Sequence, residues 1–190
     1  MKPASVSSTL RRHPERTVPD EVGDILTAGI VAHVGIVEDG LPVVIPMTYA
    51  YDLVTPHVLY IHGSIDARIL AGAERGAPAC VTVTEVSGLV YSKTALNHSM
   101  VYRSVVGFGR MTEVSDEQSK AGVLRRMIER YFSGRTEGRD FSAATSAHLA
   151  ITRLVAIEID AWSAKARKHG ATGPGDNDER VPGTSGVVEL

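Results

Sequence analysis

Residues 97–109 constrain the fold more than any other stretch, because they form one long alternating segment with polar side chains inside an apolar run. Successive side chains of a β-strand point to opposite sides, so Arg103 faces one side while Tyr102 and Ser104 face the other. An unpaired, buried Arg is costly. We therefore expect Arg103 to meet either an anion, such as a phosphate that also contacts the Ser104 hydroxyl, or a carboxylate on the next strand.

Other apolar runs, separated by turn signals such as Asp39-Gly40 and Ser87-Gly88, predict further strands. Strands are expected at 30–37, 41–51, 58–62, 78–86, 89–94, 97–114 and 151–162. Helices are expected at 19–28, 65–74 and 115–132, the last with Ser115 as its cap and Arg130 on a solvated face. This pattern predicts a mostly β fold, an antiparallel barrel with peripheral helices.

The chain divides into a flexible N-terminal segment at 1–16, one domain at 17–169 and a C-terminal tail at 170–190 that is expected to be extended or mobile. Several strands are apolar on both sides. That is expected where helices or a second subunit cover the outer side of the sheet.

Composition limits the function. The 190 residues are 43% hydrophobic and carry a net charge of −2, so nothing indicates binding to nucleic acid. No apolar run reaches the ~20 residues of a membrane span, and the basic N-terminal residues are followed by no apolar segment, so a secretory signal is not expected. Cys80 is the only cysteine, which excludes an internal disulfide and agrees with a cytoplasmic location. The scattered histidines give no pattern of metal ligands.

A second polar segment follows the strand at 58–62. Gly63 and Ser64 stand at a strand-to-helix turn, where free backbone N–H groups favour an anion, and Arg68 lies one turn further on. Ser64 has the alternative of capping the helix. Pro46 cannot donate to a ladder, so it marks a bulge, an edge or a place where a ligand meets the backbone.

These segments together resemble the flavin-nucleotide-binding proteins of the FMN-binding split-barrel superfamily. That superfamily includes pyridoxamine 5′-phosphate oxidases and nitroimidazole-resistance reductases. The resemblance rests on Gly-Leu-Pro-Val-Val-Ile-Pro-Met-Thr-Tyr, Leu-Tyr-Ile-His-Gly-Ser, Cys-Val-Thr-Val-Thr and His-Ser-Met-Val-Tyr-Arg-Ser-Val-Val-Gly-Phe-Gly, in this order. It covers residues 19–169 and implies an antiparallel split β-barrel.

The resemblance also implies a homodimer with FMN at the subunit interface. It places the flavin ring beside the backbone of Pro46, Met47 and Thr48. It assigns the ribityl and phosphate groups to His62, Gly63, Ser64, Arg68, Arg103 and Ser104, with Tyr102 packed nearby. Lys165 would reach the site of the other subunit. His62 occupies the position of a flavin-proximal histidine in nitroimidazole reductases, which makes it the candidate catalytic residue.

The implied activity is that of an FMN-dependent oxidoreductase acting on a small organic acceptor or oxygen, in which the cofactor carries the redox chemistry. Two alternatives remain on the same fold. One is a non-catalytic carrier or sensor of flavin or haem, and the other is a deazaflavin-dependent reductase.

Overall fold

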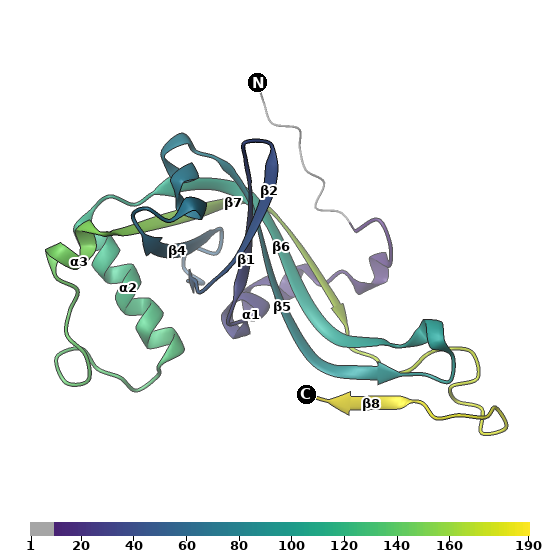
Figure 1. Ribbon diagram of the computed structural model, residues 1–190. Helices are drawn as coiled ribbons and strands as arrows, with labels where there is room; N and C mark the ends of the chain where they lie inside the picture. Colours follow the sequence, from purple (N-terminus) through teal and green to yellow (C-terminus); the bar gives the residue numbers. More distant parts are fainter. Residues whose placement is uncertain (1–9) are drawn as a thin grey trace.

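The computed structural model describes residues 10–190 and folds them around one sheet of eight strands (Figure 1). The strands are β1 (Ala32–Glu38), β2 (Leu41–Met47), β3 (Ala50–Tyr51), β4 (Val58–Ser64), β5 (Pro78–Tyr91), β6 (Ser99–Glu113), β7 (Thr152–Arg167) and β8 (Gly186–Glu189). The α-helices are α1 (Val22–Ala28), α2 (Glu117–Tyr131) and α3 (Ser146–Ala150). Short 3-10 helices span Pro14–Arg16, Pro19–Glu21, Arg68–Arg75 and Ala95–Asn97. Residues 1–9 of the expected flexible segment lie outside the described part of the chain.

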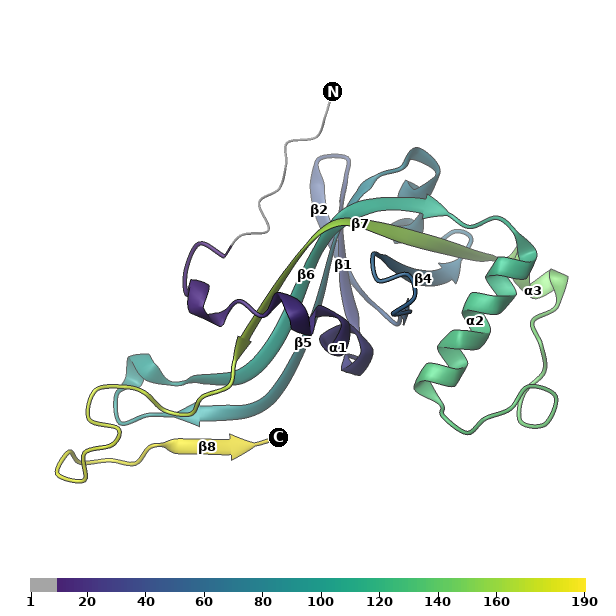
Figure 2. The same cartoon turned by 180° about the vertical axis from the view of Figure 1, so that it is seen from behind.

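The strand order is β2-β1-β5-β6-β7-β4-β3, and β8 pairs with β5. Every pairing between these strands is antiparallel. The helix α1 packs against β5 and β6, whereas α2 and α3 lie at the other end of the sheet, beside β4 (Figures 1 and 2). The predicted mostly β, antiparallel split barrel with peripheral helices is therefore confirmed.

Two clusters of buried side chains hold the fold together. The main core lies on the inner side of the sheet and includes Val34, Val83, Val105 and Ile157. The second cluster lies beneath α2 and includes Val123, Met127 and Leu154. Burying each such side chain contributes about 1.5–3 kcal/mol. The apolar face predicted for the helix at 115–132 is thus buried. The predicted N-cap, Ser115, is wrong: the N-cap is Asp116, whose carboxylate accepts a hydrogen bond from the Ser119 N–H at 2.7 Å.

The strands β5, β6 and β7 are long, and their far ends extend away from the barrel as an arm (Figure 1). The sequence predicted a turn at Ser87-Gly88 between two strands, but β5 runs straight through it. A bulge absorbs the extra residue, because Val86 pairs with Tyr102 and Gly88 already pairs with Val101. β7 also continues past the predicted end at 162, since its last residues pair with β6.

The C-terminal segment folds back onto this arm, which differs from the expected extended or mobile tail. Its strand β8 pairs with residues 88–91 of β5. The buried carboxylate of Asp176 accepts hydrogen bonds from the Ser92 hydroxyl at 2.9 Å, the Lys93 N–H at 2.8 Å and the Gly173 N–H at 2.6 Å. One buried acid thus anchors the segment by local hydrogen bonds that hydrophobic patterning does not reveal.

Candidate functional site

Cross-strand pairing defines an outer face of the sheet, opposite the main core. Ser104 on β6 stands directly across from Lys165 on β7 and from Thr84 on β5. Tyr102, two residues from Ser104, therefore shares this face and stands across from Arg167. Pro46 reaches the same face through its pairing with His33, which in turn pairs with Thr82. The structure thus brings four predicted residues, Pro46, Tyr102, Ser104 and Lys165, to one side of the sheet.

A polar band crosses this outer face, formed by Thr84, Tyr102, Ser104, Lys165 and Arg167. Arg167 is buried and donates to the Gly170 carbonyl at 3.0 Å. Lys165 is half-buried, and within the described residues no carboxylate lies within 4.0 Å of its ammonium group. Hydroxyl groups beside an ammonium group that lacks an acidic partner form a surface suited to an anion.

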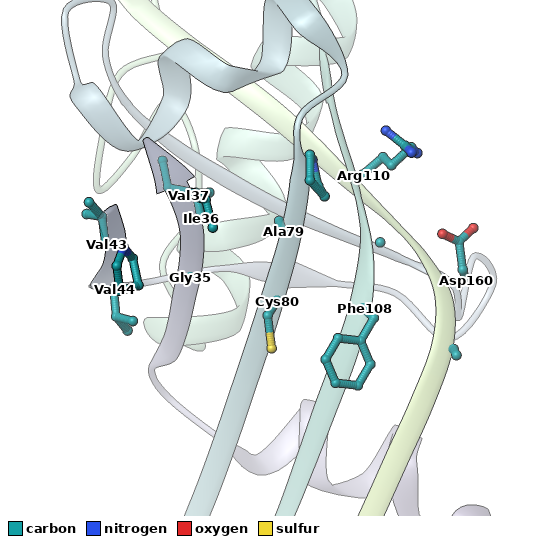
Figure 3. Close-up of a pocket in the computed structure, with 14 residues that line it drawn as sticks. Gly35, Ile36, Val37, Val43, Val44, Ala79, Cys80, Phe108, Arg110 and Asp160 are labelled. Carbon is teal, nitrogen blue, oxygen red and sulfur yellow. The ribbon is translucent and has the colours of Figure 1, made fainter. Parts of the chain in front are cut away.

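An apolar groove of about 620 Å³ lies next to the polar band on the same face. Its walls include Val44, Cys80 and Phe108, and Figure 3 shows the Cys80 and Phe108 side chains on adjacent strands. Burial raises the pKa of the Cys80 thiol. Val37 and Val44, at the edge of the groove, are 65% and 62% exposed. An open apolar surface of this kind is typical of an interaction site.

Arg103 lies on the inner side of the sheet, away from the polar band. Its Nη2 and Nε groups donate to Glu85 Oε2 at 2.6 and 2.9 Å, because Arg103 and Glu85 are directly paired across β6 and β5. Of the two partners expected for Arg103, an anion or a carboxylate on the next strand, the structure shows the carboxylate. Arg103 lines none of the four main cavities in the described chain. The structure therefore does not bring Arg103 and Ser104 to the same phosphate, since consecutive strand residues face opposite ways.

A second group of predicted residues lies near β4. Thr48 and His62 line a cavity of about 670 Å³ beneath α2. The lining residues are Ile30, Thr48, His62, Leu124, Met127, Ile128, Arg130, Tyr131 and Phe132. His62 Nδ1 is buried without a hydrogen-bond partner in the described chain, and burial lowers the pKa of the imidazole. The ring is therefore neutral near pH 7, and its Nδ1 is free of hydrogen bonds to the described part of the chain.

The remaining predicted residues of this group are not among those that line the cavity. Met47 packs against the main core, and a side chain at Gly63 would contact Leu70 at 3.2 Å. Ser64 Oγ accepts weakly from the Asp66 N–H at 3.4 Å and does not cap the following 3-10 helix, whose N-cap is Ala67. Arg68 forms an ion pair with Glu38. We call Thr48, His62, Gly63, Ser64 and Arg68 the β4-side group.

The sequence missed the role of Arg130, which was expected on a solvated face. Its guanidinium donates to the carbonyls of Tyr49, Leu26 and Gly29 at 3.1, 2.8 and 2.5 Å. It also lies over the Tyr49 ring, 4.0 Å from the centroid. Tyr131 accepts from the Tyr49 N–H at 3.0 Å. These contacts fix the C-terminal turn of α2 against the end of α1, and thereby fix one wall of the cavity.

Among residues 10–190, no three His, Cys, Asp or Glu side chains gather as a metal-binding group. No helix in this part of the chain is long and apolar enough to cross a membrane.

The fold and the outer face define the class: an antiparallel split-barrel protein with a polar band beside an apolar groove. A family model described as pyridoxamine 5′-phosphate oxidase matches residues 19–166, so the chain belongs to this family. The resemblance inferred from the sequence is thereby confirmed for family and fold.

Solved structures give more detail. The FAD and heme binding protein from Mycobacterium smegmatis is 32% identical, with a TM-score of 0.80 over 92% of this chain and 82% of that chain. The flavocytochrome Anf3 from Azotobacter vinelandii is 27% identical, with a TM-score of 0.84 over 97% of this chain and 85% of that chain.

A protein from Bacteroides thetaiotaomicron described as a 5-nitroimidazole antibiotic resistance protein is 19% identical. Its TM-score is 0.64 over 78% of this chain and 85% of that chain, and this similarity concerns the fold alone. A search of curated proteins found no match.

Proposed function

We propose that this chain binds a flavin, FMN, between two copies of itself and uses it as an oxidoreductase acting on a small organic acceptor. The main support is the polar band, where Lys165 and Ser104 stand side by side and, among residues 10–190, Lys165 has no acidic partner. A phosphate is an anion that matches an ammonium and a hydroxyl group. The names of the two most informative relatives include a flavin, either as FAD or within a flavocytochrome.

A second copy is part of the proposal because the predicted residues fall into two groups on different sides of one chain. The polar band lies on the outer face, whereas His62 points toward α2. Along β7, the positions paired with His62 and Ser104 are Leu154 and Lys165, about 36 Å apart along the strand. We propose that the β4-side group of one copy and the polar band of the other enclose one flavin.

The apolar groove supports the same arrangement. Its open aliphatic rim, with Val37 and Val44 largely exposed, is suited to burial against another subunit. A two-fold axis would repeat each contact and create two equivalent flavin sites.

The flavin would supply the transfer of electrons between a reductant and the acceptor. The chain would bind and orient it. His62 is neutral, since burial lowers its pKa, and can donate a hydrogen bond from Nε2 to a ligand in the cavity. Lys165 and Ser104 would hold the phosphate. The single cysteine, Cys80, is the basis for proposing the cytoplasm as the compartment.

A second candidate function is haem binding in the His62 cavity, and a specific observation favours it. The cavity has room at about 670 Å³, its walls are mainly apolar, and the imidazole is neutral and makes no hydrogen bond to the described protein. These are the properties of an available axial ligand. The donor set therefore fits haem, which His62 would hold. The name of the Mycobacterium smegmatis relative includes haem.

The test is to purify the protein, record its absorption spectrum and identify the released ligand by mass spectrometry. FMN would support the proposal, while haem with no flavin would favour the second candidate and a deazaflavin would favour that class of reductase. Reduction by NADH or NADPH, followed by oxidation with a nitroaromatic compound, separates an enzyme from a carrier. No turnover with any donor would contradict the oxidoreductase assignment.

A further inference from the structure

The His62 cavity carries an electrostatic feature that neither the family nor the flavin proposal assigns. Arg130 lines this cavity from the last turn of α2. Within residues 10–190, its hydrogen bonds go to backbone carbonyls only, those of Leu26, Thr27, Gly29 and Tyr49. Within the described residues, no carboxylate lies within 4.0 Å of its guanidinium.

Carbonyl oxygens satisfy N–H groups but do not cancel the positive charge. Arg stays protonated at all relevant pH values. The Arg130 Nε–H also has no hydrogen-bond partner in the described chain, so at least one donor remains available. The wall of the cavity therefore presents a partly buried cation that lacks a counter-charge.

The rest of the cavity is chemically simple. Aliphatic and aromatic side chains from α2 and its C-cap form most of the wall, namely Leu124, Met127, Ile128 and the C-cap residue Phe132. Ile30 and Thr48 lie on the side that Arg130 and Tyr131 fix in place. No acidic residue lines the cavity. Its mainly apolar lining and its single cation thus favour a molecule with an apolar body and one anionic end.

We propose that the His62 cavity binds a flat, conjugated molecule carrying a carboxylate, which meets Arg130 while the ring system lies along the apolar wall toward His62. Two sources share this chemistry: haem, through a propionate, and a small aromatic acid. The inference deepens the second candidate function and rests on the same cavity, because it assigns Arg130, which lies apart from the polar band, as the residue that meets the carboxylate.

The first experiment needs no variant. Two probe pairs are titrated into the purified protein: 4-nitrobenzoate against its methyl ester, and iron protoporphyrin IX against its dimethyl ester. A charge-assisted hydrogen bond should make the acid of at least one pair bind about tenfold more tightly than the ester. Preference in the porphyrin pair alone, with a shifted Soret band, identifies haem. Preference in the benzoate pair alone identifies a small acid.

Variants then assign the effect. Arg130→Gln should abolish the preference for acid over ester, while Arg130→Lys, which keeps the charge, should retain part of it. Arg125→Gln is the matched control, because Arg125 is an exposed arginine on the same helix that faces Glu129. Circular dichroism and thermal melting verify folding. If Arg130→Gln does not fold, the ratio of acid affinity to ester affinity, measured on the unchanged protein, decides whether the cavity prefers a carboxylate.

Equal binding of acid and ester in both pairs, or no binding of any probe, would overturn the inference. So would an Arg130→Gln protein that folds and keeps the full preference. The flavin content is measured on the same samples as a separate readout, because neither Arg125 nor Arg130 belongs to the polar band or to the β4-side group. A protein without flavin that keeps the preference for acid over ester would contradict the flavin proposal alone. A flavin-containing protein without that preference would contradict the role of Arg130 alone.

Discussion

Replacing Lys165 by Gln should weaken the binding of FMN far more than that of riboflavin. Lys165 and Ser104 are directly opposite on antiparallel strands, which places their Cβ atoms about 4.5–5.5 Å apart. One phosphate can contact both side chains at that spacing. A hydrogen bond to a charged group is worth about 1.5–3 kcal/mol, so the FMN dissociation constant should rise about ten- to hundredfold.

The assay is flavin fluorescence, titrated with protein at low and high salt. Lys168→Gln is the matched control, because it removes the same charge at a position three residues further along the chain. The Lys168 side chain is exposed and pairs with Glu21. Its affinity for FMN should stay within about twofold of the unchanged protein, since exposed ion pairs contribute little. Riboflavin lacks the phosphate and should respond to neither substitution.

Salt gives an independent check. Screening at high ionic strength should weaken FMN binding by the unchanged protein and have less effect on Lys165→Gln. If Lys165→Gln binds FMN unchanged, or loses FMN and riboflavin equally, the phosphate does not lie on the polar band and the reasoning fails.

Three further predictions concern other parts of the chain. Arg103→Ala should lower the free energy of unfolding, measured by urea denaturation, by about 1 kcal/mol, because Glu85 loses its partner, and FMN affinity should change little. Adding Glu85→Gln to this variant should recover part of the lost stability. Because burial lowers the pKa of His62, the unfolded chain binds more protons as the pH falls below 6.5, so stability should be full above that pH and decline below it. His62→Gln should flatten this decline in melting curves. Gly107→Ala should destabilise the fold by about 1–3 kcal/mol, since a Cβ would lie 2.3 Å from the Trp162 ring; an unchanged melting temperature would contradict that packing.

The sequence predicted the sides of β6 correctly, because alternation in a strand is a local property. It could not choose between an anion and a carboxylate for Arg103. That choice depends on the register with β5, where the bulge next to Val86 decides that Glu85 stands opposite. Registers between strands depend on turn and bulge geometry that composition does not specify.

Long-range contacts explain the other differences. Arg130 has the spacing of an exposed helix residue, yet it reaches the carbonyls of Leu26 and Gly29, about a hundred positions earlier in the chain. The polar C-terminal segment looks mobile by composition, but the buried carboxylate of Asp176 organises it against β5. In both cases a single polar side chain forms hydrogen bonds with backbone groups far away in the sequence. Such contacts leave no periodic pattern from which they could be predicted.

Subunit complementation tests most directly whether two copies share each flavin. Lys165→Glu and Arg68→Glu, on the polar band and in the β4-side group respectively, should each abolish FMN binding alone. After the two variants are mixed and subunit exchange is verified with differently tagged chains, mixed dimers should each regain one intact site. About a quarter of all sites should then bind FMN. No recovery despite verified exchange would show that each flavin is held within one chain, which contradicts the proposed site.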